Sequence, residues 1–133
     1  SDSSFYDNGL SQENLFRIQS DAIRKAADES SCVFVGRCAD YVLRDNPNMV
    51  TVFITADLDD RISNVCKRRN CSAEEARKLI EDKESTRSSY YNYYSGKTWG
   101  ASASYDLCVN ASRLGAEGTK EFIADFIRRR MKR

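Results

Sequence analysis

The sequence predicts an α/β domain built on a doubly wound parallel sheet, with helices on both faces of the sheet. Short apolar segments alternate along the chain with longer segments whose apolar residues recur every three or four positions. The chain of 133 residues is 41% hydrophobic and 31% charged, which is the size and composition of one globular domain. We therefore expect one core and one domain.

The first half of the chain is expected to alternate helix and strand. An apolar stripe at helical spacing, with Ser11 as its N-cap, predicts a helix that faces the core. The apolar run Cys32–Val35 is typical of a strand buried on both faces. A short helix near Tyr41 and a turn at Pro47 then lead into a second strand at Met49–Ile54, so that the two strands form a parallel crossover.

The second half continues the same pattern. A helical stripe begins at Leu58, and the segment Ser72–Glu75 matches a capping box that opens a further helix, expected to run past Arg87. Two glycines interrupt the segment that follows. Tyr105–Val109 predicts a third strand, and apolar residues from Phe122 onward predict a last amphipathic helix.

Composition excludes several classes of function. The chain has no histidine, which removes the Ser-His and Cys-His hydrolase mechanisms and leaves the chemistry to Arg, Lys, Asp and Glu. Five scattered cysteines predict reduced core thiols in a cytoplasmic protein and no metal site made of side chains. No apolar run approaches the roughly 20 residues that cross a membrane, and a net charge of +1 does not indicate a general nucleic-acid surface.

One candidate site follows the first predicted strand. Open parallel sheets bind ligands at the carboxyl ends of their strands, and Arg37 stands just after such an end. Its guanidinium suits a phosphate through two parallel hydrogen bonds, and Asp40 could take ribose hydroxyls or hold the arginine. The alternative is a turn glycine followed by an Arg-Asp pair on a helix surface.

A second candidate site is basic. After Lys67–Arg69, the residues Lys83 and Arg87 stand four apart on one helical face, where like charges cost stability unless an anion or a carboxylate such as Glu84 lies between them. A mobile basic arm could close over transferring phosphates, or the helix could simply be solvated. The tyrosines of Tyr90–Tyr94 could stack on a base, or could pack the root of the arm against the core.

Four segments, in the same order, resemble the bacterial cytidylate kinase-like family: Gly36–Asp45, Val52–Ile62, Tyr90–Lys97 and Tyr105–Asn110. The resemblance covers most of the chain from Leu10 onward, and the Tyr-rich segment is distinctive. It implies a P-loop nucleoside monophosphate kinase fold with a helical lid over about residues 67–100. It also implies transfer of the ATP γ-phosphoryl group to a nucleoside monophosphate, CMP or dCMP, with Mg²⁺. Small-molecule nucleotides are thus the expected partners.

Carried over by position, the resemblance makes Arg37 the ligand of the acceptor phosphate, and Lys83 and Arg87 the catalytic cations of the lid. Cytidylate kinases have Gly-Arg-Asp where this chain has Gly36–Cys38. The carboxylate that helps to hold a pyrimidine nucleotide is therefore either displaced to Asp40 or absent.

The resemblance also implies contacts with ATP. Arg68 or Arg69 would begin the lid near ATP, and Asn110 and Ser112 would lie in the loop that passes the adenine. No side chain of this chain is expected to hold the magnesium ion directly.

The glycine-rich loop that cradles ATP phosphates is not found in the sequence, because the six glycines are scattered. In this family the loop lies upstream, on a strand between those predicted at Cys32–Val35 and Met49–Ile54. We therefore expect the chain to be the C-terminal portion of a longer protein, a partial kinase domain with two unpaired strand edges and an exposed apolar face that folds poorly alone. The alternatives are a non-catalytic nucleotide-binding or regulatory protein, and an RNA-binding module using Lys67–Arg69 and the tyrosines.

Overall fold

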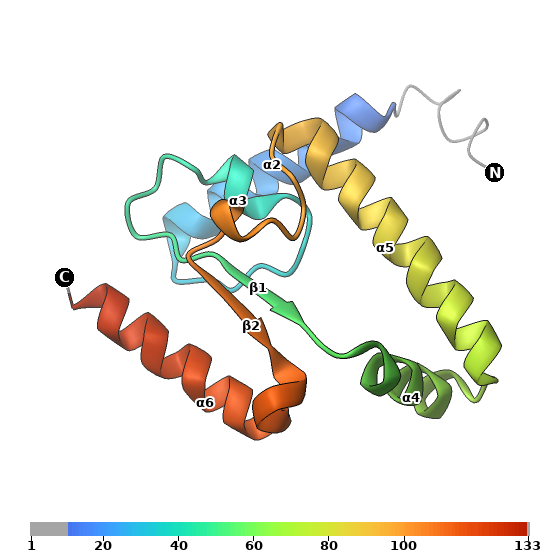
Figure 1. The fold of residues 1–133 in the computed structure, drawn as a ribbon. Helices are drawn as coiled ribbons and strands as arrows, with labels where there is room; N and C mark the ends of the chain where they lie inside the picture. The colour runs from blue at the N-terminus through green and yellow to red at the C-terminus, as the bar shows by residue number, and fades with distance from the viewer. Residues whose placement is uncertain (1–10, 133) are drawn as a thin grey trace. The chain divides into compact units, whose positions relative to one another are not determined.

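The computed structural model describes residues 11–132 and divides the chain into two compact units, residues 1–49 and 50–133 (Figure 1). It has a mixed α/β fold made mostly of helices. In the described part of the chain, no helix is both long enough and apolar enough to span a lipid bilayer.

The first unit is helical. Helix α2 (Gln12–Glu29) begins at the predicted N-cap, Ser11, whose side chain accepts a hydrogen bond from a backbone N–H of the first turn. Helix α3 (Ala39–Val42) is the short helix expected near Tyr41. Ile23 of α2 is buried against residues at both ends of α3, which gives this unit its small core.

The strand predicted at Cys32–Val35 is absent from the structure. The side chains of Val33 and Val35 are 92% and 90% exposed, and Cys32 is exposed as well. A strand exists only where its backbone N–H and C=O groups pair with a neighbour, and the described residues of the first unit contain no other strand. Apolar composition alone therefore did not make this segment a buried strand.

The second unit contains a parallel pair of strands, β1 (Val52–Thr55) and β2 (Leu107–Asn110), paired residue by residue along their length. Both were predicted, with boundaries one to three residues earlier. At the amino ends the backbone N–H of Thr51 donates to the Asp106 carboxylate over 2.9 Å, and the Asp106 N–H donates to the Thr51 hydroxyl over 2.8 Å. These reciprocal bonds fix the register of the pair.

Helix α6 (Ala111–Met131) follows β2 directly and contacts both strands. It is the predicted last helix, but it starts earlier and is kinked at Gly115, whose φ of 75° is outside the helical range. In residues 50–132 the sheet has two strands with Ile54 of β1 still 55% exposed. Two parallel strands of the predicted sheet are thus present in these residues, and the doubly wound arrangement is not confirmed.

Helices α4 (Leu58–Arg69) and α5 (Ala73–Ser95) form a hairpin (Figure 1). Asn70 reverses the chain in the left-handed conformation, with φ of 52°, and Ser72 opens α5 with the capping box expected from the sequence. Buried apolar residues of both helices hold the hairpin together: Ile62, Val65, Ala76 and Ile80.

An aromatic cluster anchors the far end of α5. Tyr91 is only 7% exposed and stacks on Tyr105 with ring centroids 6.2 Å apart. The ring centroid of Phe53, in β1, lies 5.0 Å from that of Tyr105 and 5.0 Å from that of Trp99. For Tyr91 the packing alternative is confirmed. Tyr93, in contrast, is 71% exposed.

Candidate functional site

A groove between α4 and α5 brings together most of the predicted lid cations. On each helix the lining residues recur at intervals of three or four, with one adjacent pair on each helix, so they form one stripe that faces the other helix. Apolar side chains of the core form part of the lining and charged side chains the rest, around a cavity of about 210 Å³. The lining residues are Arg61, Asn64, Val65, Arg68, Leu79, Ile80, Lys83 and Arg87.

The groove carries an excess of positive charge. Glu84 forms an ion pair with Arg61 across the hairpin, with 3.1 Å between Nη2 and Oε2, rather than lying between Lys83 and Arg87. Within residues 11–132, no carboxylate forms an ion pair with Arg68, Lys83 or Arg87. Three uncompensated cations around one cavity favour a ligand with several negative charges, such as a polyphosphate.

Of the basic residues predicted for this region, Arg68, Lys83 and Arg87 lie together in the groove. Arg69 is the last residue of α4, is exposed, and is not part of the lining. The difference follows from helical spacing, because Arg69 is rotated about 100° from Arg68 around the helix axis.

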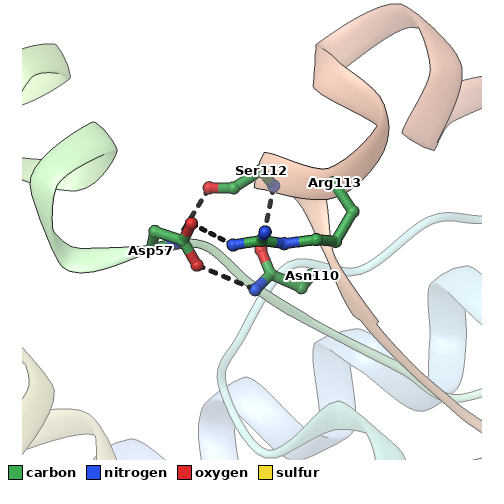
Figure 2. A network of polar contacts seen from close by, with 4 residues as sticks. All are labelled: Asp57, Asn110, Ser112 and Arg113. Atoms are coloured by element: carbon green, nitrogen blue, oxygen red, sulfur yellow. Dashed lines mark hydrogen bonds and ion pairs between the residues drawn. The ribbon is translucent and has the colours of Figure 1, made fainter.

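A second polar site lies where β1 and β2 end (Figure 2). The Asn110 amide donates to Asp57 over 3.0 Å and accepts from the backbone N–H of Ser112 over 2.9 Å. The Asp57 N–H in turn donates to the Ser112 hydroxyl over 2.8 Å, and Arg113 forms an ion pair with the Asp57 carboxylate. The structure therefore brings Asn110 and Ser112 into one network. Both were predicted to lie in a loop that passes the adenine, whereas Asn110 ends β2 and Ser112 lies in the first turn of α6.

The topology explains why these side chains meet. The strands are parallel, so their carboxyl ends lie at the same edge, where Asp57 follows β1 and Asn110 ends β2. Asp57 occupies the N-cap position of α4 without capping it by its side chain, because its carboxylate is turned to the β2 end. The Asn110 hydrogen bond first, and that from Arg113 second, lower the pKa of Asp57 below its ordinary value of 3.8.

This lowered pKa predicts a pH-dependent stability. A carboxyl group whose pKa is lower in the folded state stabilises the fold above its unfolded pKa, and this contribution is lost as the pH falls through the folded pKa. We expect Asp57→Asn to lower the urea midpoint of unfolding at pH 7. The difference from the wild type should shrink below about pH 4, where the unfolded carboxyl group becomes protonated.

Asp59→Asn is the matched control, because Asp59 is exposed in the first turn of the same helix. Urea titrations at several pH values would check the prediction. An Asp57→Asn difference that does not change between pH 7 and about pH 3 would contradict it.

A strained turn presents Arg37 in the first unit. Gly36, Arg37 and Cys38 have consecutive φ values of 74°, 61° and 59°, in a region that costs a non-glycine residue roughly 1–2 kcal/mol. Backbone strain of this kind clusters at functional sites. Arg37 is exposed, whereas the Cys38 side chain is buried. Asp40 is half-buried, and its carboxylate accepts a hydrogen bond from the Tyr41 N–H over 2.8 Å.

Sequence reasoning missed two contributors to the groove, Arg61 and Asn64. Their signal was a polar stripe on α4, in which Asp57, Arg61, Asn64 and Arg68 follow one another at intervals of four, three and four residues. In the part of the chain that the structure describes, no three Cys, Asp or Glu side chains are grouped so as to hold a metal ion.

Comparison with known proteins places the sequence in a family. The sequence model of the cytidylate kinase-like family matches residues 1–113. The chain belongs to the cytidylate kinase-like family. Its membership agrees with the resemblance seen in the four sequence segments, two of which, Val52–Ile62 and Tyr105–Asn110, include the strands that carry the polar network.

The chain is similar to two other known proteins. The chain is 29% identical over 104 residues to a cytidylate kinase of Methanopyrus kandleri, covering 72% of this chain and 54% of the relative. It therefore spans about half the length of that curated relative. It is also similar to the crystal structure of an uncharacterized protein from Eubacterium ventriosum, with a TM-score of 0.84 and 31% identity, covering 89% of this chain and 67% of that one.

Proposed function

We propose that this protein transfers the γ-phosphoryl group of ATP to a nucleoside monophosphate, with CMP or dCMP as the acceptor. The observation that carries the proposal is the groove in which Arg68, Lys83 and Arg87 meet without a carboxylate to neutralise them. Phosphoryl transfer needs little covalent help from the protein. Its catalysis rests on positioning and on neutralising the charge of the transferring group, which arginine and lysine side chains do well.

On the acceptor side, Arg37 is the residue we assign to the phosphate of the monophosphate. It is exposed on a strained turn, and its fork of N–H donors can bind two phosphate oxygens at once. A monophosphate oxygen is already ionised at neutral pH, so the attack on ATP needs no histidine or other strong base.

The preference for a cytosine nucleotide rests on family membership and on the name of the Methanopyrus relative. The local residues differ from the Gly-Arg-Asp pattern. Burial first, and the nearby Asp40 second, raise the pKa of Cys38 to about 11, so this thiol is neutral at pH 7 and does not replace a carboxylate. In our proposal Asp40, half-buried beside the same turn, supplies the negative charge instead.

ATP and Mg²⁺ are the cofactors that this function requires. The guanidinium and ammonium groups of the groove fit the phosphates of ATP, and Mg²⁺ is commonly bound through such phosphates with few protein ligands. Asn110 and Ser112 lie at the strand edge where the adenine is expected, with the Ser112 hydroxyl hydrogen still able to donate.

A P-loop fold requires one more element. We propose that in the complete protein a strand carrying the ATP phosphate loop lies beside β1, where the side chain of Ile54 is 55% exposed. This exposed apolar side chain on a two-stranded sheet supports the proposal. A structure of the complete protein with no strand on that side of β1 would refute it.

The decisive test of the function is ADP production by the complete protein with Mg-ATP and each nucleoside monophosphate in turn. A reaction without monophosphate measures background ATP hydrolysis. We expect turnover with CMP or dCMP well above that background. If nucleotides bind but no monophosphate is turned over, the kinase proposal fails and a regulatory nucleotide-binding role replaces it.

A further inference from the structure

The ion pair between Arg61 and Glu84 joins α4 to α5 across the hairpin. The buried contacts of the hairpin lie between this pair and the turn, at Ile62 and Val65 of α4 and at Ala76 and Ile80 of α5. The Arg61–Glu84 pair lies one residue before that stretch on α4 and one turn after it on α5. Beyond this point α5 continues for 11 residues, Ser85–Ser95.

Glu84 also lies within the basic stretch of α5. It follows Lys83 directly and precedes Arg87 by three positions, so holding Glu84 in place fixes the rotation of the helix turn that carries both cations. The side chains of Arg61 and Glu84 are 30% and 42% exposed, so the pair is partly shielded from solvent. On the same helix, the pair Lys78–Asp82 is far more exposed, at 78% and 65%, and does not reach α4.

The first turn of α4, which carries Arg61, is held at the end of the sheet. The side chain of Asp57, the residue before α4, contacts Asn110 and Arg113 beyond the end of β2. The Arg61–Glu84 pair joins the same turn of α4 to the middle of α5. All of these residues belong to the second unit.

We propose that Glu84 is a positioning residue, which acts through Arg61 to hold Lys83 and Arg87 in register with the strand ends. This inference rests on the proposed kinase function of the groove. It assigns the ion pair a role in the geometry of the reaction that is separate from its contribution to stability. Glu84 also neutralises one positive charge of the groove, so it lowers the affinity of the groove for an anion.

These two effects give Glu84→Gln a distinctive signature. Loss of the carboxylate makes the groove more positive, so inorganic tripolyphosphate should bind about threefold to tenfold more tightly. The orientation of the lid cations is lost at the same time, so kcat should fall about tenfold or more. A purely structural role of Glu84 does not predict tighter tripolyphosphate binding together with a lower kcat. The matched control is Asp82→Asn, which removes the exposed carboxylate on the same helix and should leave both quantities unchanged.

The experiment uses the complete protein, with tripolyphosphate affinity measured by calorimetry, steady-state kinetics with Mg-ATP and the accepted monophosphate, and thermal unfolding of each variant. Tighter tripolyphosphate binding with reduced kcat and an unchanged unfolding temperature supports the proposal. Unchanged kcat, or kcat that falls only together with the unfolding temperature and with weaker tripolyphosphate binding, overturns it. If the wild type turns over no monophosphate, the proposed function itself has failed, and wild-type tripolyphosphate affinity still reports whether the groove binds polyphosphate.

Discussion

Arg37→Ala is expected to reduce kcat/KM for the acceptor nucleotide about 100-fold, while the KM for ATP and the thermal unfolding temperature stay close to those of the wild type. The reason for the large loss is that a bidentate, charge-assisted contact fixes the acceptor phosphate for attack, and small misplacements of a nucleophile are costly. The reason for unchanged stability is that Arg37 is exposed and that alanine tolerates its left-handed backbone about as poorly as arginine.

Arg37→Gly sharpens this experiment, because glycine adopts a φ of 61° without strain. It should lose acceptor binding as alanine does, yet unfold at an equal or higher temperature, with a gain of roughly 1 kcal/mol. Arg24→Ala is the control for removing an exposed arginine of the same unit. Wild-type kinetics in both Arg37 variants would exclude Arg37 from the site, and loss of folding in both would favour a structural role.

Arg87→Ala is expected to lower kcat about 100-fold to 1,000-fold, with a smaller change in the KM values. An arginine that neutralises charge on the transferring phosphoryl group acts more strongly in the transition state than in the ground state, so its removal is seen mainly in kcat. Lys83 also lines the groove, four residues before Arg87. Its ammonium group lacks the planar fork of a guanidinium, so it should replace Arg87 poorly.

Lys78→Ala is the matched control for Arg87→Ala. Lys78 is a cation of the same helix, 78% exposed and paired with Asp82, and it is not part of the groove. Its removal should leave kcat within about twofold of the wild type. Equal losses in the Lys78 and Arg87 variants, measured under conditions where each is folded, would show that the effect comes from net charge and not from the site.

Short-range features of the sequence predicted most of the local structure by themselves: caps, apolar stripes and turns. Ser11 and the capping box at Ser72 each predicted the first residue of a helix, because a side chain that satisfies a free backbone N–H acts within three residues. The strands at Val52–Thr55 and Leu107–Asn110 were predicted from short apolar runs bounded by turn residues.

The same reasoning failed at Cys32–Val35, where the apolar run forms no strand. Pairing of backbone groups depends on a partner that is distant in the sequence, and composition within the run carries no information about that partner. Two of the five cysteines, Cys32 and Cys108, are likewise exposed although core positions were expected for them.

The family and the individual basic residues could also be inferred from the sequence, through the order of four segments and the spacing of Lys83 and Arg87. Only the tertiary structure decided which of them act together. It placed Arg61 and Arg68 opposite Lys83 and Arg87. It also paired Glu84 with Arg61 and joined Asp57 to Asn110 at the end of β2. These pairings link residues 23 and 53 positions apart. Helical periodicity defines the face on which a side chain lies, but the packing of α4 on α5 and the parallel register of β1 and β2 determine which face it meets.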